Sequence, residues 1–213
     1  MKEFILDICS LFLLLLAGIL LYGFESRETL GFERSSLLCN RVRKSQPFFY
    51  YIHDSNTNLE FKAETRAILI NSRINNKFTI RETDDQKLAD ISIELRSRSS
   101  LTKHHSNLEY YPGTTKPIRF SFTWQYTKPY IAIDDINWTN GVKESGLSLF
   151  EYRKYVIQHE FMHALGYDHQ PCNTNTAVNG VCPILYQSTR GPPVGFKSGY
   201  EVLDIDYTKK IRV

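Results

Sequence analysis

Three histidines that lie close together in the sequence could bind one metal ion. His159 and His163 are one helical turn apart, so their imidazoles would project from the same face of a helix. Gly166 would let the chain leave that helix through a positive φ angle and carry His169 back to the first two rings. Imidazole nitrogens are ligands that zinc prefers, and three of them leave its fourth position open. The sequence therefore predicts one catalytic Zn²⁺ ion bound by these three histidines.

Glu160 is placed to activate a water molecule in that open position. A zinc-bound water has its pKa lowered towards neutrality. Glu160 directly follows His159, and it would accept the proton of that water during attack on a peptide carbonyl and pass it to the leaving amine. The pattern predicts a zinc-dependent endopeptidase that hydrolyses peptide bonds with a zinc-bound water and Glu160 as general base. Two alternatives are an ordinary amphipathic helix with core histidines and a zinc site without catalysis.

A helix that could hold two of the ligands has a clear start signal. Ser148 is followed three residues later by Glu151, and in a capping box each of these side chains bonds a free backbone N–H of the first turn. We expect this helix to run to Leu165, because Gly166 suits the left-handed position that ends a helix.

The segment from His159 to His169 resembles the metzincin signature HExxHxxGxxH of zinc endopeptidases. Residues 131–187 are similar to a little-characterised group of metzincin-like domains found mainly in actinobacterial proteins. In that group a Trp precedes a Ser-Leu-x-Glu-Tyr-Arg helix start and a cysteine follows the third histidine. Here these residues are Trp138, 148–154 and Cys172. The resemblance implies an α+β, metzincin-like (zincin) domain with a twisted sheet, an active-site helix and a C-terminal helix.

One departure from the family concerns the methionine that metzincins place in a tight turn beneath the metal. The chain has only Met1 and Met162, and neither is at the required position. The best counterpart is the segment 182–186, with Leu185 at the Met position; exchanging Met for Leu nearly conserves volume. The resemblance implies that Leu185 forms a packing floor and that Tyr186 reaches the zinc or the oxyanion. A tyrosine packed beside the site is the alternative for Tyr186.

The remaining pattern predicts an α+β order of elements. Alternating or aromatic runs predict strands at 48–52, 78–80, 91–95, 118–126 and 130–133. Ala63, Ala67, Ile70 and Ile74 form a helical stripe within 59–75. We expect loops at 96–115 and through Gly141 and Gly146, and a last helix capped by Ser198 and Glu201. The strand at 118–126 is either an edge that receives an extended substrate or a buried central strand.

Some polar side chains could support the metal site or join it. Asp168 and Gln170 flank His169 and could orient it. His104 and His105 could join a metal site, but a pair in an exposed loop is more often solvated.

Two of the four cysteines suit a disulfide. Cys172 and Cys182 bracket a short loop, and such a bond requires an oxidising compartment; small buried hydrophobes are the alternative. Cys9 falls in the apolar N-terminal segment, as a buried thiol or an acylation site, and Cys39 stands alone, where it could in principle occupy the zinc and keep the enzyme latent. No CxxC occurs, which argues against a cysteine zinc site.

The N-terminal segment is apolar enough to span a membrane. No charge occurs from residue 8 to 24, and with 4–6 the segment reaches the roughly 20 residues that a spanning helix needs. We expect a retained anchor; a cleaved signal peptide is the alternative. The predicted organisation is a transmembrane signal anchor at 1–24, a stem at 25–46 and the peptidase domain at 47–213.

The orientation of the anchor receives conflicting signals. Basic residues after the span, among them Arg41 and Arg43, favour a cytosolic body. The sequon Asn137–Trp138–Thr139 and the cysteine pair favour the other side, and we expect an extracytoplasmic domain.

Composition limits the other functions. A net charge of +3 on 213 residues, without an aromatic and basic stripe, argues against nucleic acid as a partner. We expect one membrane-anchored domain that cleaves a polypeptide. The alternatives are an envelope binding module that retains a structural zinc site and a zinc amidase that acts on cell-wall peptides.

Overall fold

The computed structural model describes residues 46–55, 58–104, 121–124 and 129–201. These residues belong to one compact unit, Ser45–Arg212. The predicted anchor at 1–24 and nearly all of the predicted stem lie outside the described residues, as do Cys9 and Cys39. Within the described ranges, no helix is both long and apolar enough to cross a bilayer.

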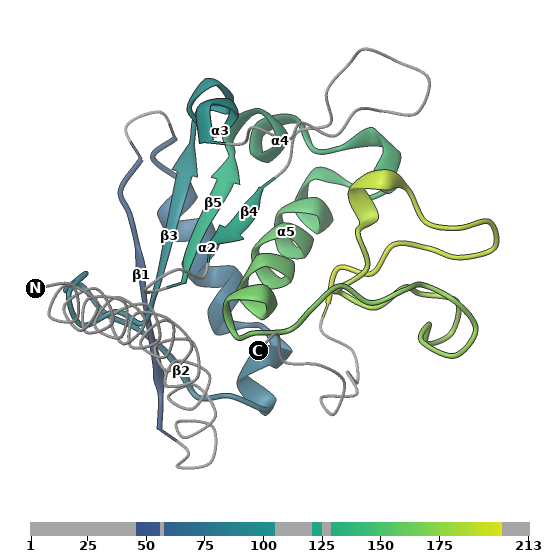
Figure 1. Cartoon of the computed structure of the whole chain (residues 1–213), viewed down its shortest axis with the longest axis horizontal. Helices are drawn as coiled ribbons and strands as arrows, with labels where there is room; N and C mark the ends of the chain where they lie inside the picture. The colour runs from purple at the N-terminus through teal and green to yellow at the C-terminus, as the bar shows by residue number, and fades with distance from the viewer. Residues whose placement is uncertain (1–45, 56–57, 105–120, 125–128, 202–213) are drawn as a thin grey trace, which may run out of the picture. The chain divides into compact units, whose positions relative to one another are not determined.

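A five-stranded sheet forms the centre of the fold (Figure 1), in the order β2-β1-β3-β5-β4. The strands are β1 (Phe48–Ile52), β2 (Ile80–Glu82), β3 (Ile91–Arg96), β4 (Phe122–Trp124) and β5 (Tyr130–Asp134). The first four in the sheet order run parallel, and β4 pairs antiparallel with β5 at the edge. The domain is therefore a mixed α/β fold, and the predicted strand at 118–126 contributes its described residues 122–124 to the edge.

Alternating side chains divide the sheet into two faces. In β1 and β3 every second residue is buried, from Phe48 to Ile52 and from Ile91 to Leu95. Tyr50 on this buried face meets the ring of Phe161 edge-on, with 5.9 Å between ring centroids. Because Phe161 lies next to the predicted metal ligands in sequence, the buried face of the sheet supports the helix that carries them.

A helical segment connects β1 to β2, another follows β3, and the remaining helices come after β5. The helices are α2 (Phe61–Ile70), η1 (Arg73–Asn76), α3 (Arg98–His104), α4 (Asp135–Asn140), η2 (Lys143–Ser145), α5 (Leu149–Ala164) and η3 (Ser188–Arg190). The longest, α5, contacts α2, α4, β4 and β5, and Figure 1 shows it on the side of the sheet where β4 and β5 lie. This helix is the element that the rest of the fold positions.

The helix predicted at 59–75 is shorter, and its buried face is different. Ile70 is 64% exposed, and Ala63 and Ala67 are exposed as well. The buried positions of α2 include Phe61 and Thr65, because Phe61 packs against Trp138 of α4 with ring centroids 4.9 Å apart. The predicted stripe is therefore wrong except for Ile74, which is buried in η1.

Three other element predictions need correction. The strand predicted at 78–80 is β2, which begins at Ile80. The loop predicted at 96–115 contains α3, and α4 precedes Gly141 where a loop was expected. Asp134 caps α4 by accepting from Asn137 N at 2.8 Å.

The described chain after α5 consists mostly of loops that hydrogen bonds hold in place. Ser198, predicted to cap a last helix, instead donates its hydroxyl to the Ser145 carbonyl at 2.6 Å. Residues 199–201, where the first turn was predicted, are not helical, and Glu201 pairs with Lys154 instead of completing a cap. The residues after 201 lie outside the described ranges. Gly199 passes so close to the Cys182 carbonyl that a Cβ there would collide with it. These contacts hold the loops against the helical half of the domain.

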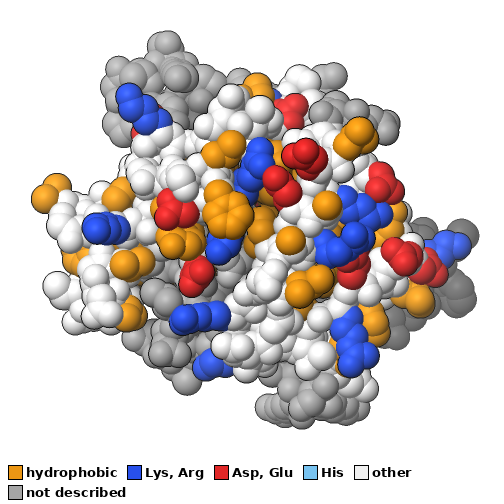
Figure 2. Space-filling view, turned by 180° about the vertical axis from the view of Figure 1, so that it is seen from behind, with side chains coloured by type: hydrophobic (Ala, Val, Ile, Leu, Met, Phe, Trp, Pro, Cys, Tyr) orange, Lys and Arg blue, Asp and Glu red, His pale blue; other side chains and the backbone are white. Residues whose placement is uncertain are grey.

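Charged side chains of both signs are interspersed on the face seen from behind (Figure 2). Among the described residues, Arg153 pairs with Glu64 at 2.7 Å and Lys154 with Glu201 at 3.6 Å. That face therefore carries no extended field of one sign.

Candidate metal centre

The start and end of α5 are built as the sequence predicts. The Ser148 hydroxyl accepts from Glu151 N at 3.3 Å, and the Glu151 carboxylate accepts from Ser148 N at 2.9 Å. Leu165 is the C-cap, and Gly166 follows with φ 96°. A side chain at that φ would be strained, so glycine allows the sharp exit that leads to His169.

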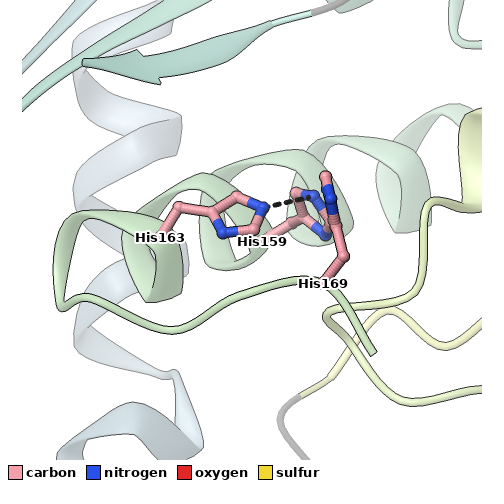
Figure 3. Close-up of side chains that lie close together, drawn as sticks. All are labelled: His159, His163 and His169. Atoms are coloured by element: carbon pink, nitrogen blue, oxygen red, sulfur yellow. Dashed lines mark hydrogen bonds between the residues drawn. The ribbon is translucent and has the colours of Figure 1, made fainter. Parts of the chain in front are cut away.

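The three predicted ligands come together. One ring nitrogen from each of His159, His163 and His169 lies within 4.8 Å of the others. Figure 3 shows two of these side chains on α5 and His169 on the loop that follows it. His159 is only 4% exposed, whereas His169 is exposed. The group can therefore hold a metal ion at the edge of the core with one side open.

Two backbone carbonyls fix the orientation of the helical ligands. The Nδ1 atom of His159 lies 2.7 Å from the Ile184 carbonyl, and that of His163 lies 2.7 Å from the Tyr167 carbonyl. Because a carbonyl oxygen only accepts, each Nδ1 must carry the hydrogen. Each Nε2 then presents a lone pair to the site, as a metal ligand requires.

The two Nε2 atoms are 3.0 Å apart (Figure 3, dashed line). With both hydrogens on Nδ1, two lone pairs face each other and repel. A tetrahedral ion with nitrogen ligands at about 2.0–2.1 Å places them about 3.3 Å apart. The observed separation and lone-pair directions therefore fit a shared cation.

Burial keeps His159 neutral. Loss of solvent holds the pKa of its imidazole well below the usual value, and the neighbouring His163 lowers it further. A neutral imidazole is the form that binds a metal. The site is thus ready for an ion at neutral pH.

Glu160, which follows His159 in α5, is buried at 5% exposure. Its charge adds to the burial that raises the pKa of Tyr155 well above the usual value. The structure therefore places an ionisable carboxyl group in the helix turn that carries both His159 and His163.

The segment Cys182–Ser188, here called the floor segment, contacts the ligands from a later part of the chain. Leu185 is fully buried, and its carbonyl accepts from Gln170 N at 3.0 Å. Tyr186 N donates to the Pro183 carbonyl at 2.9 Å, which closes a turn around Ile184 and Leu185. The hydroxyl of Tyr186 donates to the Gly191 carbonyl at 2.9 Å, so this hydroxyl is engaged in the loop.

Tyr155 supports the candidate site, and the sequence did not lead us to predict it. Its hydroxyl donates to the Tyr186 carbonyl at 3.0 Å and accepts from Ser188 N at 3.1 Å. Its ring lies 5.0 Å from the ring of His159 between centroids. The signal was present, because Tyr155 is one helical turn before His159 and so lies on the same face.

The predicted disulfide is present between Cys172 and Cys182. It joins the loop that carries His169 to the floor segment and encloses a short hairpin. Asn179 and Gly180 both have positive φ at the hairpin tip, with Val178 and Val181 exchanging backbone hydrogen bonds.

Other predicted polar residues have structural roles or lie outside the description. Asp168 accepts from His169 N at 3.0 Å. His104 ends α3, and His105 lies outside the described residues. Asn137 of the sequon is 8% exposed, and its side-chain oxygen accepts from Arg98 at 2.6 Å. A glycan on Asn137 is incompatible with this fold, so the sequon no longer bears on the location of the domain.

Comparison with known families gives a match without a function. The family described as "Protein of unknown function (DUF3152)" matches residues 61–206, more than half of the chain. The match spans α2, the three histidines and the disulfide. No functionally curated protein matches the chain.

Proposed function

The chain belongs to the DUF3152 family of unknown function, and we propose that this domain is a zinc-dependent endopeptidase of the metzincin type. The observation that carries the proposal is the convergence of three imidazole nitrogens within 4.8 Å next to the buried carboxyl group of Glu160. Three nitrogen ligands leave a position for water, whereas purely structural zinc sites usually have four protein ligands.

Each side chain has a defined role in this reaction. Bound zinc would supply a Lewis acid that acidifies water and polarises the scissile carbonyl. His159 and His163 present their lone pairs to the ion because backbone carbonyls hold their other nitrogens. Glu160 accepts the proton of the attacking water and donates it to the leaving amine.

The edge of the sheet near α5 favours a polypeptide as the substrate. β4 is one of the two edge strands of the described sheet, and it contacts α5, which carries two ligands. An extended peptide could pair with an edge strand through backbone hydrogen bonds and lie across the site.

The disulfide favours an extracytoplasmic location for the domain. Disulfides persist mainly in oxidising compartments, and Cys172–Cys182 is formed here. Membrane anchoring through residues 4–24 stays a prediction from the sequence.

Substitution of Glu160→Gln in the full chain tests the function. We expect both parent and variant to bind one zinc ion, and the variant to cleave a library of quenched peptides at least 10²-fold more slowly. Glu151→Gln on the same helix is the matched control, because Gln also completes a capping box, and it keeps full activity.

Two outcomes would contradict the proposal. A folded parent that binds no zinc would remove the metal centre. A zinc-loaded parent that cleaves no peptide would instead favour a binding module with a structural zinc site.

A further inference from the structure

His169 is the only one of the three ligands that α5 does not carry. The backbone hydrogen bonds of α5 hold His159 and His163. The carbonyls of Ile184 and Tyr167, outside the helix, orient their rings. His169 is exposed and lies on the loop after Gly166. Its position therefore depends on how that loop is held further along the chain.

The loop is fastened just after His169 at two points. Gln170 N donates to the Leu185 carbonyl at 3.0 Å, and Cys172 forms the disulfide with Cys182. Both partners lie in the floor segment. The covalent attachment is only three residues from the ligand.

The floor segment is itself attached to the helix. Its Ile184 carbonyl accepts from Nδ1 of His159 at 2.7 Å, and its Tyr186 carbonyl accepts from the Tyr155 hydroxyl at 3.0 Å. Three segments are therefore connected in a ring around the metal ligands. The helix leads into the His169 loop, the disulfide joins that loop to the floor segment, and hydrogen bonds join the floor segment to the helix.

We infer that the Cys172–Cys182 disulfide is a positioning element for His169, which makes the metal affinity of the site depend on thiol redox state. Breaking the bond leaves the two helical ligands on α5 and removes the covalent attachment of the loop that carries the third, so that the Gln170–Leu185 hydrogen bond is left to hold it to the floor segment. The inference rests on the proposed metal centre and adds a control to it.

A dithiol is the reductant class that completes the switch. One of its thiolates attacks Sγ of Cys172, which is 8% exposed against 1% for Cys182, and releases the Cys182 thiolate. The second thiolate of the reductant then attacks the mixed disulfide and releases the Cys172 thiolate. Two electrons pass to the protein, and the reductant leaves as a cyclic disulfide.

The test measures zinc affinity in the full chain by competition with a chromophoric chelator. All proteins carry Cys9→Ser and Cys39→Ser, so that only one disulfide is in question. This background is compared with the same protein carrying Cys172→Ser and Cys182→Ser, each with and without His169→Ala. A dithiol-reduced sample, freed of reductant by anaerobic gel filtration, shows whether reduction has the same effect.

We expect the two serines to weaken zinc binding about ten- to hundredfold, the range seen for residues that orient metal ligands. The decisive result is the coupling. His169→Ala should cost about tenfold or more in the disulfide-bonded protein and under about threefold in the serine variant, because the freed histidine contributes little there.

Each remaining outcome counts against the inference. Equal zinc affinity with and without the disulfide, or additive effects of the two changes, would overturn it. Loss of the far-ultraviolet circular dichroism in both the serine variant and the reduced sample would show that the disulfide stabilises the whole fold and has no specific effect on His169. A disulfide-bonded, folded parent without zinc affinity would overturn the proposed metal centre itself.

Discussion

At the scale of single residues, the centre depends on groups whose chemistry is ordinary but whose positions are set from a distance. Ile184 lies 25 residues from His159 in sequence and orients it only through a backbone carbonyl. Tyr155 ties the same stretch of chain to α5 with one donated and one accepted hydrogen bond. The ligands are therefore local in sequence, whereas the carbonyl that orients His159 comes from a distant stretch of chain.

Tyr155→Phe should destabilise the protein and loosen the floor segment. The change keeps the ring beside His159 but removes both hydrogen bonds of the hydroxyl, while Ser188 N still donates to the Tyr186 carbonyl. Two lost hydrogen bonds should together cost about 1–3 kcal/mol of unfolding free energy. Urea unfolding of the apo protein measures it.

Tyr186→Phe is the comparison for that measurement. It removes one half-buried bond, to Gly191, and should cost less than Tyr155→Phe. If Tyr186→Phe instead leaves stability unchanged and lowers peptidase activity, Tyr186 reaches the zinc or the oxyanion, as the family resemblance implies. A stability cost of Tyr155→Phe no larger than that of Tyr186→Phe would contradict the role given to Tyr155.

At the scale of elements, α5 carries its own start signal. Replacing Ser148 by Ala removes the acceptor for Glu151 N and should cost about 1 kcal/mol of stability. The cap is about three turns from His159, so the zinc affinity of the variant should be unchanged under conditions where it is fully folded. Thermal unfolding and zinc titration of the same variant separate the two effects. A large loss of zinc affinity would show that the cap acts on the site itself.

Local signals made some elements predictable and left others hidden. The bounds of α5, β1 and β3 could be predicted because caps and alternation are written in adjacent residues. The buried face of α2 could not, because Thr65 is buried and Ile70 is exposed, and contact with Trp138 of α4 decides this. α4 is six residues long, too short for a periodic pattern.

The same distinction applies to the site. The three histidines share one short motif, so residue type and spacing were enough to predict that they come together, whereas the role of Glu160 as general base stays a prediction. The Ile184 and Tyr167 carbonyls could not be found this way, because every residue has a carbonyl and only the fold selects one. The disulfide itself could be predicted from the spacing of the two cysteines. That it joins the His169 loop to the segment that orients His159 could be seen only in the fold.

At the scale of the whole molecule, the buried sheet face should make the fold sensitive to alkali. Burial, helped by the charge of Glu82, raises the pKa of Tyr50 to about 12. The unfolded side chain loses its proton near pH 10. Between these values only the unfolded chain ionises, so stability falls as pH rises through this window.

Tyr50→Phe should remove part of that slope. The largest contribution of one such group is about 1.4 kcal/mol per pH unit. Urea unfolding at pH 8, 10 and 11 should show a smaller loss for the variant than for the parent. Tyr130, whose pKa burial also raises to about 12, provides a second variant. Parallel curves for parent and both variants would contradict the assignment.

The hairpin inside the disulfide also bears on how the chain tolerates cutting. Residues 173–181 are mostly exposed, with Val178 at 43%, and exposed tips are preferred sites of proteolysis. A single cut by an elastase-type protease at Val178 would put the three histidines and the floor segment on different polypeptides, joined by one covalent bond. We expect this two-chain form to run as one band on a non-reducing gel and to keep its zinc. Separation into two bands without reductant would contradict this expectation. In such a nicked protein the Cys172–Cys182 disulfide would be a covalent link between the two polypeptides, alongside the hydrogen bonds from Gln170 and His159 to the floor segment.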